Sequence, residues 1–182
     1  MTLFLVTFLS IYIAMHALVF WGIHPLLAGH PALPVLSASW MGLMVVAPLM
    51  VRLLDRAGHL AAARATAWVG YCWMGFLFLA FCLFALVALW HLAALLLARF
   101  WPSLPLLTPH RPAGAAAVLL VVLAVGLYGF YEAAHLRIET VRLVTAKLPP
   151  GMPGLRIAQI SDLHLGLIHR EESLAPLVAA LE

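Results

Sequence analysis

Charged residues are scarce in this sequence. Asp, Glu, Lys and Arg together make up 9% of its 182 residues, whereas they make up about a quarter of a typical soluble domain. Hydrophobic residues account for 65%. This composition excludes a soluble globular protein for most of the chain and indicates an integral membrane protein. We therefore expect the lipid bilayer among its partners. Because the net charge is only +3, we expect no nucleic acid among them.

Cysteine is also nearly absent. Cys72 and Cys82 lie in the same apolar segment, where the intervening helix would separate them by about 15 Å and exclude a disulfide between them. No Asp, Glu or Lys lies well inside any of the long apolar segments. Because intramembrane ionisable residues mark ion and proton pathways, their absence argues against an ion-coupled transporter.

Long apolar segments, by contrast, are abundant. Each is long enough to cross a hydrocarbon layer of about 30 Å. We predict transmembrane helices at about residues 3–23, 34–54, 66–98 and 113–131. The third segment is too long for one perpendicular span, so we expect one tilted helix whose end leaves the bilayer. Residues 24–31, with two prolines, are predicted to form a turn, and the small pair Ala38 and Gly42 would permit close helix approach.

The distribution of Lys and Arg predicts the orientation of these helices. The loop after the second helix and the region after the fourth carry more Lys and Arg than the other two loops. The residues concerned are Arg52, Arg56, Arg64, Arg137, Arg142 and Lys147. Because cytoplasmic loops are enriched in these residues, we expect both termini, and hence the C-terminal region, on the cytoplasmic side.

The character of the sequence changes near residue 135. We therefore divide the chain into a transmembrane anchor of four helices, residues 1–134, and the start of a second domain, residues 135–182. Two strands are predicted in this second part, at residues 135–147 and 155–161, because β-branched residues alternate with charges in the first and an apolar run fills the second. A short helix is predicted at residues 174–182, with Ser173 as its N-cap.

Side chains with catalytic chemistry follow the second predicted strand. Asp162 and His164 are two positions apart, and such residues of an extended segment point to the same side. A carboxylate and an imidazole that converge at the end of a strand suit a transition-metal ion. Gly166 would let the following loop turn sharply beside the metal. By spacing alone, an exposed loop Asp and a solvated His remain the simpler explanation.

The whole string LRIAQISDLHLG, residues 155–166, is more specific. It resembles the first signature of the calcineurin-like metallophosphoesterases, in which an apolar strand runs into a D-x-H-x-G motif. The upstream strand and the linker LPPGMPG look like the membrane-anchored bacterial branch of that family. The resemblance covers about residues 138–182. It implies that Asp162 binds or bridges the metals of a two-metal centre and that His164 is a terminal ligand.

The resemblance also implies a fold and an activity. The expected fold class is an α-helical membrane bundle followed by the first strands and helix of an incomplete α/β metallophosphoesterase domain. Family members hydrolyse phosphate esters or pyrophosphates with two metal ions of the Mn, Fe or Zn class. Their remaining ligands lie in downstream motifs that do not follow His164 here. We therefore expect an N-terminal fragment, inactive alone, from an enzyme of the bacterial cytoplasmic membrane with a lipid-linked or soluble phosphate ester as substrate.

Two alternatives remain open. The chain could be a non-enzymatic four-span scaffold whose C-terminal segment is vestigial. Less favoured is a haem-binding membrane subunit, because His16 and His91 both lie within predicted spans and intramembrane ionisable residues are functional candidates by default. The ordinary explanation of such histidines is a neutral imidazole that is hydrogen-bonded to a neighbouring helix.

Overall fold

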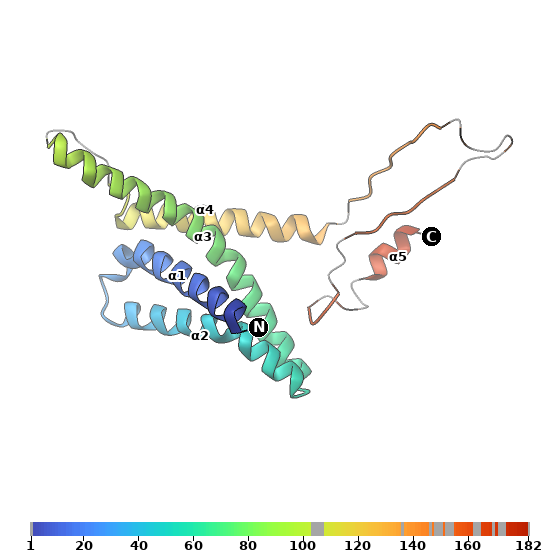
Figure 1. The fold of residues 1–182 in the computed structure, drawn as a ribbon, viewed down its shortest axis with the longest axis horizontal. Coiled ribbons are helices and arrows are strands. Elements are labelled where there is room, and N and C mark those ends of the chain that lie inside the picture. The colour runs from blue at the N-terminus through green and yellow to red at the C-terminus, as the bar shows by residue number, and fades with distance from the viewer. Residues whose placement is uncertain are drawn as a thin grey trace. The chain divides into compact units, whose positions relative to one another are not determined.

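The computed structural model describes residues 2–102, 108–135, 137–145, 147, 151, 155–161, 165–168, 170 and 174–181. The chain divides into two units, Met1–Phe130 and Tyr131–Glu182. Long helices make up the first unit. The second contains the end of the last long helix, extended segments and one short helix (Figure 1).

Four long apolar helices account for nearly all of the first unit. They are α1 (Thr2–Leu27), α2 (Ala32–Arg56), α3 (Leu60–Phe100) and α4 (Pro112–Ala134). Each is long and apolar enough to cross a membrane. The predicted helical bundle of four spans is therefore confirmed, and the chain is an integral membrane protein. The third span is one uninterrupted helix of 41 residues, as its length predicted.

Two local predictions about these helices are wrong. The turn predicted at residues 24–31 is shorter, because α1 continues through Pro25 to Leu27. A proline removes one intrahelical hydrogen bond, and a membrane helix tolerates this loss when the freed carbonyl finds another partner. The pair Ala38 and Gly42 is not a point of close approach: both residues are exposed, and nothing lies within 4 Å of a Cβ placed on Gly42.

Close packing of the first three helices depends on other small residues. The Phe84 ring of α3 is 1% exposed and lies directly on Gly22 of α1, where a Cβ would overlap with it. Ala47 of α2 lies against Gly70 of α3. Small residues let helix backbones approach where lipid provides no hydrophobic driving force between helices. These contacts therefore set the positions of α1 and α2 along α3.

The fourth helix joins this core through α3. The Phe76 ring of α3 covers Gly126 of α4 at a position where a Cβ would overlap with it. The rings of Phe76 and Phe130 lie 6.0 Å apart. Ala115 and Val122 of α4 belong to the same buried cluster as Phe84. An aromatic ring of α3 thus lies over a glycine of a neighbouring helix at two positions.

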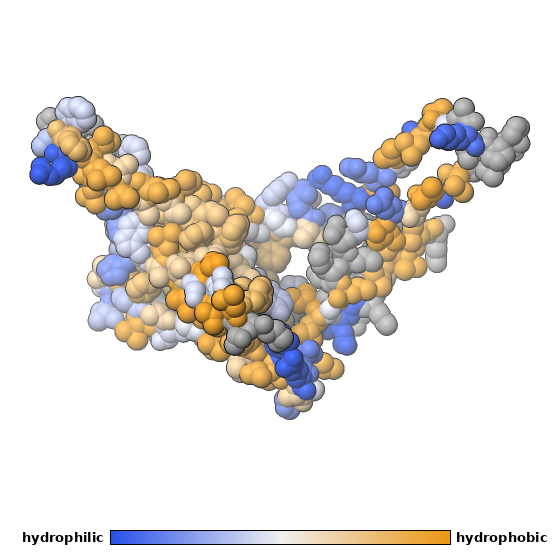
Figure 2. Space-filling view, in the orientation of Figure 1, coloured by the Kyte–Doolittle hydropathy of each residue, from blue (hydrophilic) through white to orange (hydrophobic). Residues whose placement is uncertain are grey.

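Large apolar side chains outside this core face outward from the four helices. Figure 2 shows apolar residues over most of the visible face of the helical unit. Examples that are each more than half exposed come from α1, α3 and α4: Leu3, Phe78, Leu120 and Leu127. In a bilayer, acyl chains cover such side chains, and helices satisfy their own backbone hydrogen bonds. The exposed apolar surface of this unit is therefore the surface that lipid contacts.

The second unit has no β-strand among its described residues. Residues 137–145 and 155–161, which lie within the predicted strands, run as extended chain (Figure 1). A strand forms only where a neighbouring strand pairs with its backbone N–H and C=O groups, and the described part of this unit provides no such ladder. This part of the predicted fold class is therefore not observed. The helix predicted near the end is present as α5 (Ala175–Leu181).

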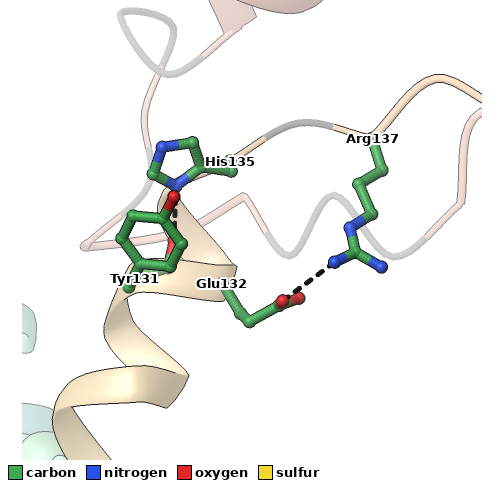
Figure 3. A network of polar contacts seen from close by, with 4 residues as sticks. All are labelled: Tyr131, Glu132, His135 and Arg137. Atoms are coloured by element: carbon green, nitrogen blue, oxygen red, sulfur yellow. Dashed lines mark hydrogen bonds and ion pairs between the residues drawn. The ribbon is translucent and has the colours of Figure 1, made fainter.

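A small polar network marks the end of α4 (Figure 3). Nδ1 of His135 donates a hydrogen bond to the Tyr131 carbonyl at 2.6 Å, and the two rings lie 4.2 Å apart. Arg137 forms an exposed ion pair with Glu132 at 2.9 Å. The last carbonyls of a helix lack intrahelical partners, and His135 satisfies one of them. The network thus marks where the helix gives way to extended chain.

Candidate functional site

The predicted metal ligands Asp162 and His164 lie outside the described residues, as does the predicted N-cap Ser173. Gly166 is described: it is exposed at a bend, and nothing lies within 4 Å of a Cβ placed on it. Its φ does not fall in the left-handed region that favours glycine. Among the described residues, no group of three or more His, Cys, Asp or Glu could hold a metal ion.

The segment that leads to this motif borders an open hollow. Residues 137–141 and 155–161, together with Leu177 and Leu181 of α5, line a space of about 780 Å³. Leu155 and Ile157 are 68% and 81% exposed. The apolar side chains of the two extended segments therefore lie around a space that no described residue fills.

A polar cluster lies inside the membrane unit, around His16, which is 4% exposed. Trp73 of α3 donates its indole N–H to Nε2 of His16 at 3.0 Å. Nε2 therefore carries the lone pair, and the opposite nitrogen, Nδ1, donates to the carbonyl of Tyr12 at 2.8 Å. Both ring nitrogens are used and the imidazole is neutral. His16 is a link between α1 and α3.

This arrangement argues against His16 and His91 as a pair of haem ligands. An axial ligand binds iron through a free imidazole nitrogen, and His16 has none. Its partner Trp73 lies 18 residues before His91 on α3, which corresponds to about 27 Å along the helix. The two histidines are therefore at different depths of the bundle and cannot ligate one iron.

His91 belongs instead to a second cluster, with Trp21 and His110. Trp21 lies near the end of α1, His91 lies in the last third of α3, and His110 lies two residues before the start of α4. The rings of Trp21 and His110 are parallel within 1°, with centroids 4.0 Å apart. The His91 centroid lies 5.8 Å from that of His110 and 6.1 Å from that of Trp21. We call these three residues the His–Trp cluster.

Trp21 also positions His110 through its backbone. Nε2 of His110 donates a hydrogen bond to the Trp21 carbonyl at 3.0 Å. In an uninterrupted helix this carbonyl would accept from the N–H four residues later, but that residue is Pro25, which has no N–H. The proline within α1 therefore frees the carbonyl that holds His110. With Nε2 as donor, Nδ1 of the neutral His110 ring carries the lone pair.

The turn before α4 fixes His110 from the other side. The backbone N–H of Arg111 donates to the Pro109 carbonyl at 2.8 Å, and Arg111 Nε donates to Thr108 Oγ1 at 3.2 Å. Gly114 is required here, because a Cβ at this position would overlap with the Pro109 carbonyl oxygen. The backbone of His110 is therefore fixed by a constrained turn, and its imidazole is held by Trp21.

One atom of the His–Trp cluster lacks a partner. Nδ1 of His91 is buried and has no hydrogen-bond partner among the described residues. A buried polar atom without a partner costs about 1–3 kcal/mol, and native proteins keep few such atoms. The Tyr12 hydroxyl is the other such atom among the described residues. Only His91 Nδ1 belongs to a ring that lies beside a second imidazole, that of His110, and this makes it the better indication of a ligand.

The sequence alone did not associate His110 with His91. His110 lies in a Pro-rich connection, where a histidine is ordinarily exposed. Pro25 was an available signal, because a proline within an apolar span predicts a free carbonyl at Trp21. That signal does not name the donor, which comes from a residue 89 positions away along the chain.

Comparisons of the chain with protein-family models, curated proteins and solved structures found no match. A proposal of function therefore rests on the sequence motif at residues 155–166 and on the geometry of the described residues.

Proposed function

We propose that this chain is the membrane anchor and the first segment of a metal-dependent phosphoesterase. The observation that carries the proposal is the string LRIAQISDLHLG, residues 155–166. It resembles the first metal-binding signature of the calcineurin-like metallophosphoesterases. The four membrane helices before it would tether the catalytic domain to a bacterial cytoplasmic membrane, with the domain on the cytoplasmic side.

The exposure of the extended segments supports this proposal. Leu155, Ile157 and Ile160 of the segment before the motif are 68%, 81% and 42% exposed, although all three are strongly apolar. Ile138 and Val141 of the other extended segment are 71% and 74% exposed. The run at residues 155–160 is typical of a strand buried on both faces of a sheet, and the alternation in the other segment is typical of a half-buried strand. In the proposed enzyme, further strands would pair with these segments and cover their side chains.

Asp162 and His164 would contribute the first ligands of the metal centre. Carboxylate and imidazole donors together suit ions of the Mn, Fe or Zn class. Two such ions, when bound, supply an activated water or hydroxide and stabilise the charge that develops on phosphate oxygens. Asp162 would bind or bridge the metals, and His164 would hold one of them. Further side chains must complete a centre of two ions, because two donors leave most coordination positions open.

The substrate class follows from the same resemblance. A phosphate monoester or diester is expected, and attachment to a membrane favours one that is lipid-linked. A soluble diester such as bis(p-nitrophenyl) phosphate is a suitable probe, because its hydrolysis reports the chemistry without the lipid.

The reading frame after the codon for Glu182 provides the first test. We expect it, in any frame, to encode a GD-type motif, an Asn-His pair and further histidines. If none is encoded, the proposal is wrong, and a four-span scaffold becomes the better interpretation.

Hydrolysis provides the second test. The protein encoded together with that downstream sequence should hydrolyse bis(p-nitrophenyl) phosphate with Mn²⁺. Asp162→Ala and His164→Ala should each lower the rate at least about 100-fold, because each removes a ligand. His169→Ala is the matched control and should retain the rate, since this histidine lies outside the motif. Activity that survives Asp162→Ala would remove Asp162 from the site.

A further inference from the structure

We propose that His91 and His110 bind a late transition-metal ion of the copper or zinc class through their Nδ1 atoms. The site lies at the end of the bundle where α1 and α3 end and α4 begins. It is separate from the proposed phosphoesterase centre, which uses Asp162 and His164.

The hydrogen bonds of the cluster leave the correct nitrogens for a metal. Nε2 of His110 donates to the Trp21 carbonyl, so Nδ1 of His110 holds a lone pair. Metal-binding histidines commonly donate their other N–H to a backbone carbonyl, which fixes the tautomer and the ring orientation. Nδ1 of His91 is buried without a hydrogen-bond partner among the described residues. A shared metal ion would use the lone pair of one ring and satisfy the orphaned nitrogen of the other.

The separation of the two rings fits a shared ion. With a metal–nitrogen distance of about 2.0–2.1 Å, the centroid of a bound imidazole lies about 3.2 Å from the metal. The centroids of two rings that bind one ion are then about 5.2 Å apart when the nitrogen–metal–nitrogen angle is tetrahedral. They are about 6.4 Å apart when the two nitrogens lie on opposite sides of the metal. The observed distance between the His91 and His110 centroids is 5.8 Å, within this interval.

The structure also holds His110 in place before any ion binds. The parallel Trp21 ring, 4.0 Å away, limits rotation of the imidazole, and the Trp21 carbonyl fixes its tautomer. The carbonyl is free for this role because of Pro25. A ligand that is already oriented loses little conformational entropy when the metal binds.

The donor set selects the kind of ion. Neutral imidazoles suit copper and zinc, whereas Mg²⁺, Ca²⁺ and Mn²⁺ prefer oxygen ligands. No carboxylate or thiolate completes a three-residue metal group within the described chain. The guanidinium of Arg111, the residue after His110, is exposed and hydrogen-bonded to Thr108. With two protein ligands, the other positions of a tetrahedral ion would hold water, and the ion would exchange readily.

The test measures metal binding to the whole chain in detergent, purified without a polyhistidine tag. All variants are made on a background with Asp162→Asn and His164→Gln, so that the other proposed ligands do not contribute. Equilibrium dialysis against micromolar Zn²⁺, with Mn²⁺ as comparison, should show about one Zn²⁺ per chain and no Mn²⁺. Cu²⁺, examined by electron paramagnetic resonance, should show hyperfine coupling to two nitrogens.

Variants locate the ion. His91→Gln and His110→Gln should each weaken Zn²⁺ binding at least about tenfold. Gln at residue 110 retains a donor for the Trp21 carbonyl, so loss of binding there is not loss of that hydrogen bond. Pro25→Ala, which keeps both ligands but restores an N–H to compete for the Trp21 carbonyl, should weaken binding less. His30→Ala, an exposed histidine in the loop between α1 and α2, is the matched control and should not change it.

The outcomes that overturn the proposal are specific. Full Zn²⁺ binding in the His91→Gln, His110→Gln double variant would show that the cluster holds no metal. An equal loss with His30→Ala would show that surface histidines bind the ion nonspecifically. Circular dichroism in detergent shows whether either single variant unfolds. If one does, the electron paramagnetic resonance spectrum of the protein with both histidines provides the test. Coupling of Cu²⁺ to fewer than two nitrogens contradicts the proposal. A failure here would leave the phosphoesterase proposal unaffected, because that centre is absent from the background.

Discussion

The two units of the chain both expose large apolar side chains, but they differ in whether the backbone that carries those side chains is hydrogen-bonded. In Met1–Phe130 these side chains project from helices whose backbone groups pair within the helix. In Tyr131–Glu182 they project from extended chain that has no ladder among its described residues. A lipid bilayer can cover the first surface but cannot satisfy the backbone of the second. The same degree of exposure therefore indicates a membrane partner in the first unit, whereas in the second it leaves backbone groups that only water or another protein segment can satisfy.

Hydrogen exchange should show the largest difference between the units. We expect amides within α1–α4 to exchange at least about 1,000-fold more slowly than amides of residues 137–145 and 155–161, because a helix opens only by local or global unfolding. Exchange measured by mass spectrometry in detergent micelles would test this. Slow exchange at residues 155–161 would contradict this expectation, since it would mean that a strand ladder forms in the chain by itself.

Packing at the glycines should give the next largest effect. Gly22→Ala places a methyl group where the Phe84 ring lies, and such overpacking costs about 1–3 kcal/mol. The free energy of unfolding can be followed by circular dichroism during titration of the micelles with SDS. Gly42→Ala is the matched control, because nothing lies within 4 Å of its Cβ position. Equal effects of the two changes would show that the bundle is not packed on Gly22.

The link between α1 and α3 should contribute less. His16→Leu leaves the indole N–H of Trp73 without its acceptor, and interhelical hydrogen bonds in membranes average about 0.6 kcal/mol and reach about 1.7 kcal/mol. We expect a loss of about 1 kcal/mol in the same SDS titration. Trp73→Phe added to His16→Leu should cost less than the sum of the two. Additive losses would mean that the two side chains do not interact.

The ion pair at the junction should matter least. Glu132 lies in the last turn of α4, Arg137 lies three residues beyond the end of the helix, and the Arg137 side chain is 76% exposed. Exposed ion pairs contribute about 0–1 kcal/mol and weaken with salt. Arg137→Gln should therefore change the stability of the bundle by less than about 0.5 kcal/mol, which is the usual effect of a surface substitution. A larger loss would show that the extended segments help to stabilise the helices.

The sequence predicted the helices well because each span contains its own signal. Length and continuous apolarity suffice for a membrane helix, since all its backbone hydrogen bonds are local. That is why α3 was predicted as one helix despite its length. The end of α1 was missed because Pro25 looks like a terminator, and its tolerance depends on His110, which is remote in sequence.

The same reasoning explains what was predicted less well elsewhere. Strands depend on partners, so the patterns at residues 135–147 and 155–161 could indicate a preference but not the sheet that would realise it. Asp162 and His164 are predicted as metal ligands through a motif, and both their role and their geometry stay predictions. The His–Trp cluster could not be found from spacing, because Trp21, His91 and His110 come together only when three helices pack.

The length of α3 has a consequence for the membrane itself. Between Arg64 and Arg99 the helix has no charged residue, and this run is about 51 Å long. At a tilt of 40°, the upper end of the usual range, it would still span about 39 Å, against a hydrocarbon layer of about 30 Å. The mismatch must be absorbed by thickened lipid around the helix or by apolar surface outside the bilayer, and Leu95, Leu96 and Phe100 are 59%, 58% and 74% exposed. The distribution of the protein among bilayers of different acyl-chain length distinguishes the two: thickened lipid predicts a preference for thicker membranes, and a helix end that leaves the bilayer predicts none.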